Sequence, residues 1–186
     1  MYKRQVYHEA LPGHHLNFAI ARELTNYPEF RKNASFNAYQ EGWGLYAEKL
    51  AKEMGAYKDP YSDFGRLTGE IWRAIRLVVD TGIHAHDWTR QQALDYMLAN
   101  AALSSHEIST EVDRYISWPG QALSYMIGKI RIRELRREAE AALGPDFDIR
   151  GFHDAVLELG SVPLPILAEH LRGWIELQKS RLAEAG

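Results

Sequence analysis

Three of the eight histidines in this 186-residue chain lie within eight positions near its start. They are His8, His14 and His15, and Glu9 directly follows the first of them. Neutral imidazole is a favoured zinc ligand, and a hydrolytic zinc site typically uses three protein ligands and leaves one position for water. Proline and glycine separate the histidines, so helix propensity does not explain the arrangement. The pattern predicts a metal site, against the simpler alternative of exposed polar residues.

The spacing of the histidines favours His14 over His15 as the second ligand. On an unbroken helix, the six steps from His8 to His14 would turn the two side chains about 120° apart. A kink or bulge at Pro12-Gly13 would absorb two residues and swing His14 back toward His8. His15 shares a face with His8, but it lies about 10.5 Å along the axis, which is a long reach for ligands about 2.0–2.1 Å from one ion. His15 remains the alternative to His14.

A third ligand is expected from a second helix, predicted over residues 37–48 and able to pack antiparallel to the first. Glu41 and Glu48 are seven positions apart and share one face of this helix. The two glycines between them are costly in a helix and indicate close approach to a neighbouring backbone. We expect Glu41 to be the third ligand, and Glu48, with Gln40 as a further candidate beside it, to orient a metal-bound histidine.

The elements that position these residues are predicted to be helices. Glycine and proline punctuate the chain, and between them apolar residues recur at steps of three and four. One such run predicts a single buried helical face made by Phe64, Leu67, Ile71, Ile75 and Val78. Further helices are predicted over residues 121–143 and 164–182, and no segment alternates with the period of a strand. We predict an all-α fold of about six to eight packed helices, forming a single domain over residues 1–186.

The composition narrows the classes of partner and chemistry. The 22 basic and 25 acidic residues give a net charge of −3, so no basic excess indicates a nucleic acid or a membrane surface as a partner. The absence of cysteine excludes a disulfide framework, a thiolate metal site and a cysteine nucleophile. No stretch approaches the roughly 18 apolar residues of a membrane span, and residues 1–9 lack the apolar run of a secretory signal. These observations predict a soluble, cytoplasmic protein.

Two blocks of sequence carry a resemblance to a known family. They are His8-Glu9-Ala10-Leu11-Pro12-Gly13-His14-His15 and Glu41-Gly42-Trp43-Gly44-Leu45-Tyr46-Ala47-Glu48. With further matching stretches at residues 80–84, 114–125, 152–154 and 162–164, they resemble the bacterial family filed as domain of unknown function 885. That family looks related to the gluzincins, the mostly helical zinc peptidases typified by angiotensin-converting enzyme and the thimet-type oligopeptidases.

The resemblance carries expectations about the ligands and the extent of the chain. The gluzincin pattern is H-E-x-G-H followed by a glutamate about two dozen residues later. Aligning the Gly-His pair implies His14 as the second ligand, with Glu41 as the third, 27 residues further on. Members of the family are usually several hundred residues long, so the chain resembles only their C-terminal portion, a zincin-like catalytic helical half. A homodimer is one way to complete the cleft.

The resemblance implies a zinc-dependent hydrolase that cleaves an amide bond in a short peptide or a peptide-like metabolite. With Zn²⁺ on the three predicted ligands, Glu9 would act as general base toward the attacking water. Tyr115 is the first candidate for a donor to the oxyanion and Tyr125 the second. His84 is expected to be a further oxyanion donor, a substrate contact or a helix cap.

Two other readings of the same residues stay open. The chain could be a non-catalytic helical module for metal binding or assembly, or a metalloenzyme of other chemistry that acts on a small molecule. Manganese or iron could also occupy the ligands expected for zinc.

Overall fold

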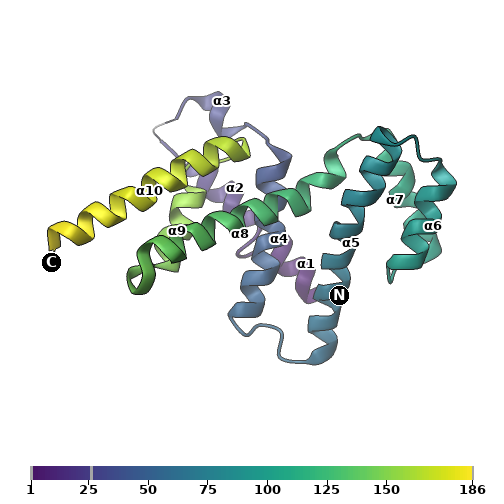
Figure 1. Ribbon diagram of the computed structural model, residues 1–186, viewed down its shortest axis with the longest axis horizontal. Coiled ribbons are helices and arrows are strands. Elements are labelled where there is room, and N and C mark those ends of the chain that lie inside the picture. The colour runs from purple at the N-terminus through teal and green to yellow at the C-terminus, as the bar shows by residue number, and fades with distance from the viewer. Residues whose placement is uncertain (1, 26, 186) are drawn as a thin grey trace.

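The computed structural model describes residues 2–25 and 27–185, and all of the regular structure in this part of the chain is helical (Figure 1). The helices are α1 (Tyr2–Glu9), α2 (His14–Glu23), α3 (Glu29–Lys32), α4 (Asn37–Glu53), α5 (Pro60–Ala85), α6 (Arg90–Asn100), α7 (Ser105–Ser117), α8 (Ser124–Leu143), α9 (Ile149–Leu157) and α10 (Leu164–Ala185). Two 3₁₀ turns, η1 (Gln121–Leu123) and η2 (Gly144–Asp146), flank α8. The predicted all-α class is confirmed. The numbering runs past the six to eight helices predicted because α3 is a single turn and because the segment that holds the first two histidines is divided into α1 and α2.

Local sequence explains where several helices begin. Asp59 accepts a hydrogen bond from the Ser62 backbone ahead of α5, whose first residue is Pro60. Thr89 and Ser104 each form a complete capping box, at α6 and α7 respectively. These caps satisfy backbone N–H groups that would otherwise lack partners at the start of a helix.

The centre of the fold is the crossing of α4 and α8, the most extensive helix pair among the described residues. The two backbones meet at glycines, because a Cβ on Gly42 would lie 2.5 Å from the Cα of Gly128. Beside this crossing, Trp43 and Tyr46 enter the largest core cluster, together with side chains of α8, α9 and α10. α4 is therefore held firmly, and its other face is available to position a site.

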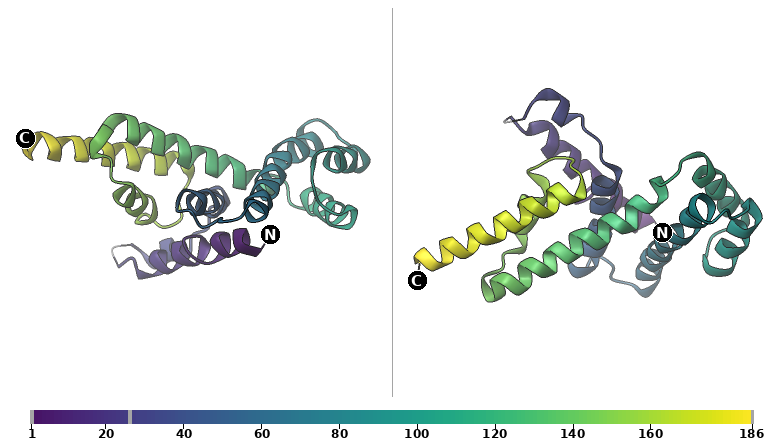
Figure 2. Two further views of the ribbon diagram at one scale, coloured as in Figure 1. Left: turned by 90° about the horizontal axis from the view of Figure 1, so that it is seen from below. Right: turned by 45° about the horizontal axis from the view of Figure 1, so that its top comes forward.

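The helices around this pair form layers, which are visible in the left view of Figure 2. α8 and α10 run side by side in one layer, α4 and α9 lie beneath them, and α1 and α2 lie on the far side of α4. α5, α6 and α7 form a separate group at one end, with their own core cluster around Val79, Met97 and Val112. No helix in the described residues is both long and apolar enough to cross a membrane.

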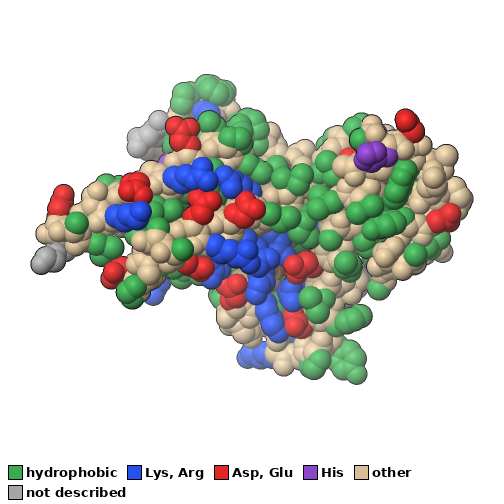
Figure 3. Space-filling view, in the orientation of Figure 1, with side chains coloured by type: hydrophobic (Ala, Val, Ile, Leu, Met, Phe, Trp, Pro, Cys, Tyr) green, Lys and Arg blue, Asp and Glu red, His purple; other side chains and the backbone are tan. Residues whose placement is uncertain are grey.

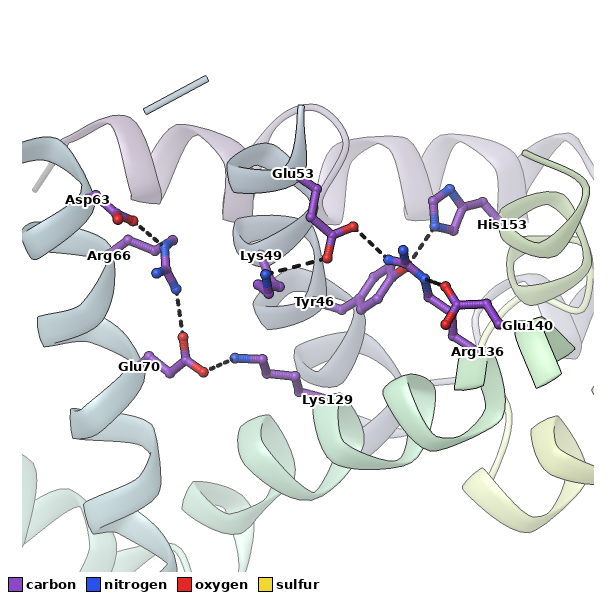
Figure 4. Close-up of polar contacts among 10 residues, drawn as sticks. All are labelled: Tyr46, Lys49, Glu53, Asp63, Arg66, Glu70, Lys129, Arg136, Glu140 and His153. Carbon is purple, nitrogen blue, oxygen red and sulfur yellow. Dashed lines mark hydrogen bonds and ion pairs between the residues drawn. The ribbon is translucent and has the colours of Figure 1, made fainter. Parts of the chain in front are cut away.

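Ion pairs and hydrogen bonds tie α4, α5, α8 and α9 together (Figure 4). The buried Lys129 of α8 donates to Glu70 of α5 at 2.5 Å, and Glu70 also accepts from Arg66. On the other side of α4, the hydroxyl of Tyr46 lies 2.8 Å from His153 Nε2 of α9. These contacts give the polar side chains inside the fold partners that offset the cost of burying them.

The predicted buried face of α5 is only partly buried. Ile75 lies in the core of the α5–α7 group, whereas Phe64, Leu67 and Ile71 are 64%, 48% and 47% exposed, and Val78 is also exposed. The prediction was wrong for these four residues because the opposite face of α5 is the one that packs against α1 and α8. That opposite face carries Arg66, Gly69, Arg73, Arg76 and Asp80.

Candidate metal centre

Three side chains from three helices meet at one point. His8 Nε2 lies 3.4 Å from Glu41 Oε2, and His14 Nε2 lies 3.2 Å from the same oxygen. The three atoms that would serve as ligands all lie within 4.8 Å of one another. Ligands placed tetrahedrally at about 2.0–2.1 Å from an ion are roughly 3.3 Å apart. The separations from Glu41 therefore already fit a single small cation.

The Pro12-Gly13 segment produces this convergence by ending one helix and starting another. α1 ends at Glu9, and α2 begins at His14 after Gly13. Gly13 packs so closely on the end of α1 that a Cβ there would overlap the carbonyl groups of Tyr7 and His8. The two imidazoles consequently approach across the break, with ring centroids 4.7 Å apart.

His15 lies outside this group. It follows His14 on α2, and its side chain is exposed. The neighbouring positions point in different directions because successive residues of a helix are about 100° apart. The group of potential ligands in the described residues is His8, His14 and Glu41.

Glu48 orients the first histidine. Its Oε1 lies 2.9 Å from His8 Nδ1 and accepts a second hydrogen bond, also of 2.9 Å, from Arg4. When Nδ1 donates its proton to a carboxylate, the lone pair of Nε2 is directed toward a metal. The structure therefore places Glu48 in the orienting position expected from the sequence. Gln40 lies elsewhere, since its side chain accepts from Ser35.

Gly44 allows the His8 ring to lie directly on α4. A Cβ at position 44 would be 2.8 Å from His8 Cε1 and 2.9 Å from Nε2, closer than real Cβ contacts. The ring is thus held between the α4 backbone on one side and its hydrogen bond to Glu48 on another. Of the two glycines noted in the sequence, Gly42 serves the α8 crossing and Gly44 serves the site.

The electrostatics of the group favour an anionic carboxylate. Burial acts to raise the pKa of Glu41, but hydrogen bonds from His14 and His8 outweigh it and lower the pKa to about 2. For His8, burial acts to lower the pKa, and hydrogen bonds to Glu41 and Glu48 reverse this and raise it. In the absence of a metal, these hydrogen bonds hold the three side chains in place. Two imidazoles and one ionised carboxylate form a donor set suited to a divalent cation.

The structure brings Tyr125 to the site and leaves Tyr115 away from it. The Tyr125 ring stacks on His8, with centroids 6.2 Å apart. Tyr115 belongs to the α5–α7 core, where its hydroxyl accepts hydrogen bonds from Trp72 at 3.0 Å and Arg76 at 2.9 Å. Burial raises the pKa of Tyr115 to about 12. Of the two tyrosines considered, Tyr125 is therefore the one that lies against a predicted ligand.

The remaining predicted catalytic residues occupy different surroundings. Glu9 is the last residue of α1 and is exposed next to His8. His84 Nε2 lies 2.9 Å from the Tyr115 carbonyl oxygen, at the end of α7. This position suits a donor to the C-terminal end of α7, whereas the cap considered from the sequence was of the helix directly before His84. That helix, α5, runs on to Ala85 and contains His84.

Buried arginines support the site, and the sequence analysis did not single them out. Arg4 lies one turn before His8 on α1, so the spacing of four was the available signal. Arg73 and Arg76 of α5 lie over the Tyr125 ring, with guanidinium carbons 5.6 and 4.5 Å from its centroid. Burial lowers the pKa of Arg73 to about 10, and the neighbouring Arg4 adds to the effect.

A loop anchored by Asp80 sets the position of Tyr125. Both carboxylate oxygens of Asp80 accept from the backbone N–H of Gly120, at 3.1 and 3.2 Å. Gly120 has a φ of 79°, in the left-handed region that favours glycine, and it opens the η1 turn before α8. Two of the stretches noted in the sequence, at residues 80–84 and 114–125, thus meet in space behind the site.

The fold and the site define an all-α protein with a His-His-Glu group that could hold a metal ion. The chain matches the family described as "Bacterial protein of unknown function (DUF885)" over residues 1–171, and it belongs to that family. No curated protein matches the chain.

Two solved structures share the fold. One is described as "the putative lipoprotein from Colwellia psychrerythraea"; it is 46% identical, with a TM-score of 0.92, over 94% of this chain and 30% of that one. The other is described as "a putative lipoprotein of unknown function from Shewanella oneidensis", at 25% identity and a TM-score of 0.83, over 90% of this chain and 31% of that one. The present chain spans about 30% of the length of these relatives.

Proposed function

We propose that the site binds Zn²⁺ and that the protein is a gluzincin-like hydrolase, which cleaves an amide bond in a short peptide or a peptide-like metabolite. The observation that carries the proposal is the pair of 3.2 and 3.4 Å separations between Glu41 Oε2 and the two imidazole nitrogens. Two imidazoles and one carboxylate are the protein ligands of known catalytic zinc sites with an open position for water. The side chains of His14 and Glu41 are 13% and 20% exposed, so the group can be reached from solvent.

The residues of the chain would divide the work of hydrolysis between them. His8, His14 and Glu41 would hold the ion, which supplies a water activated at neutral pH and polarises the substrate carbonyl. Glu9 would take a proton from the attacking water and return it to the leaving amine. Tyr125, stacked beside His8, would donate its hydroxyl proton in a hydrogen bond to the developing oxyanion.

The metal content and two substitutions test this proposal. Protein purified without added metal should contain about one zinc per chain. His8→Ala should abolish stoichiometric binding, whereas His15→Ala, the matched control on the exposed neighbour, should leave it unchanged. Glu9→Gln should keep the metal and lose amide hydrolysis. A fully active Glu9→Gln variant would show that the assignment of the general base is wrong, even if zinc is present.

We also propose that the protein acts in the cell envelope. Both solved relatives are described as putative lipoproteins, which is the observation that supports this location over the cytoplasmic one expected from the sequence. The substrate would then be an envelope or imported peptide-like molecule. Cell fractionation of the native host, with detection by an antibody to the chain, tests this location; recovery with the cytoplasmic fraction would contradict it.

A further inference from the structure

Helix α5 has its polar and apolar faces reversed with respect to the core. Phe64, Leu67, Ile71, Ala74 and Val78 fall within an arc of about 80° on the helix, at about 100° per residue. The opposite face carries three arginines and an aspartate, all of them buried. An amphipathic helix normally turns its apolar face toward the core.

The reversal is tolerated because most of the buried charges of α5 have polar or ionic partners inside the fold. Arg73 donates to the Gly69 carbonyl oxygen and lies over the Trp72 and Tyr125 rings. Arg66 donates to Asp63 and Glu70, and Arg76 donates to Glu111 and to a tyrosine hydroxyl.

At the edge of the apolar face, Ile75 packs against α6 and α7, and Ala74 packs against Tyr125 and Met126. Toward the N-terminal end of α5, Phe64, Leu67 and Ile71 are exposed. The N-terminal half of the apolar face therefore remains open.

The open half forms a groove of about 430 Å³. The groove is lined mostly by apolar side chains, among them Phe64, Leu67, Ile71, Ala74 and Met126. Its one charged residue, Glu70, is already engaged by Lys129 and Arg66. In Figure 3, hydrophobic side chains gather on the half of the molecule that holds α5, α6 and α7, while lysines and arginines gather over α4 and α8. A ligand for this surface would therefore be apolar.

We propose that this groove is the docking surface for a helical segment of the longer family polypeptide, drawn from the part of the relatives' chains that the present chain does not match. The chain superposes on the Colwellia relative with a TM-score of 0.92 but accounts for only 30% of it, so most of that relative is additional polypeptide, available to cover a face that is open in the present chain. The docking segment presents apolar side chains at helical spacing to Phe64, Leu67 and Ile71, in the manner of a helix in a groove. This inference is independent of the metal site and of the proposed hydrolysis.

Cysteine labelling tests the proposal, because the chain has no cysteine of its own. Leu67→Cys probes the groove, and Leu98→Cys on α6 is the matched control, since the two leucines are 48% and 51% exposed. In the present chain both cysteines should react with a maleimide at similar rates. In the full-length Colwellia relative, made free of other cysteines, the position equivalent to Leu67 should react roughly tenfold more slowly or less, and the Leu98 equivalent should not be slowed, since a covered side chain reacts only through local opening.

Three results would overturn the inference. One is equal labelling of the two positions in the full-length relative. Another is a labelling rate of Leu67→Cys in the present chain that decreases as the protein concentration rises, which would identify a second copy as the occupant. A third is slow labelling at every concentration, which would mean that the groove is closed by the chain itself. Ile71→Cys, measured in parallel with circular dichroism as a folding check, replaces Leu67→Cys if that variant does not fold.

Discussion

Gly44→Ala should weaken metal binding more than it weakens the fold. The added Cβ would lie 2.8 Å from His8 Cε1 and 2.9 Å from Nε2, whereas ordinary contacts begin at 3.4 Å. The His8 ring must therefore move by about 0.6 Å or more, given the spacing that close-packed interiors require. Glu48 opposes this movement through its 2.9 Å hydrogen bond to Nδ1.

The size of the effect follows from the tolerance of a metal site. Ligand distances in such sites hold within about 0.2 Å, and changes to groups that orient a ligand typically cost about 10–100-fold in metal affinity. We expect a loss of this size for Gly44→Ala, equivalent to about 1.4–2.7 kcal/mol. In the metal-free protein, overpacking should cost about 1–3 kcal/mol of folding free energy, of which the better helix propensity of alanine restores only about 0.5–1 kcal/mol.

The assay is competition for Zn²⁺ against a chromophoric chelator at fixed pH, alongside thermal unfolding of the metal-free protein. Gly173→Ala is the matched control, because a Cβ at this helical glycine of α10 meets nothing within 4 Å. The control should keep the parent's metal affinity and gain about 0.5–1 kcal/mol of stability. If Gly44→Ala binds zinc within about twofold of the parent protein, a difference of roughly 0.4 kcal/mol, the reasoning about His8 is refuted.

Three further predictions concern the core, the pH dependence and the tyrosines. Gly42→Ala should destabilise the fold by roughly 1–3 kcal/mol in urea unfolding, because the Cβ would lie 2.5 Å from Gly128 Cα; an unchanged midpoint would contradict the close crossing. Burial, reinforced by a nearby arginine, lowers the pKa of His153 to about 4. Between about pH 6.5 and 4 the unfolded chain therefore binds more protons than the folded protein, and the free energy of unfolding falls as the pH falls through this window. The free energy of unfolding should fall by roughly 1–2 kcal/mol across this window, after allowance for partial exposure. In His153→Gln the fall should be smaller; a fall as steep as that of the parent protein would exclude this histidine as its source. Tyr125→Phe should lower kcat for amide hydrolysis by about 100-fold and leave the zinc content unchanged. Tyr115→Phe should leave kcat unchanged and lower the free energy of unfolding by about 1 kcal/mol. The reverse pattern in the two variants would show that Tyr115, not Tyr125, is the donor to the oxyanion.

Short-range sequence patterns predicted the parts of the site that depend on neighbouring positions. Two side chains six residues apart would diverge by about 120° on one helix, so a shared ion on His8 and His14 required a break, and Pro12-Gly13 was the place for it. The structure has that break, with α1 ending at Glu9. The heptad spacing of Glu41 and Glu48 likewise placed both carboxylates on one face of α4, and they contact the two sides of the same imidazole.

The spacing of apolar residues did not predict which face of α5 is buried, because contacts between distant parts of the chain decide this. The apolar repeat of α5 correctly predicts a helix, but burial depends on which neighbours reach each face. Buried ion pairs such as Arg76–Glu111 join residues 35 positions apart, and the spacing of residues within one helix does not predict them. Phe64 and Leu67 are exposed for that reason, although their spacing is that of a core helix.

The amino-acid sequence by itself determined the helical class, the break between the two histidines and the residue types able to hold a cation, because these depend on backbone geometry within a few residues. Tertiary structure alone decided which tyrosine stands beside His8, that Arg4 supports Glu48, and that the apolar stripe of α5 is open. The physical reason is that each of these depends on the packing of helices distant in sequence, set by close approaches such as Gly42 against Gly128. Such approaches fix the position of a side chain only once the whole chain has folded.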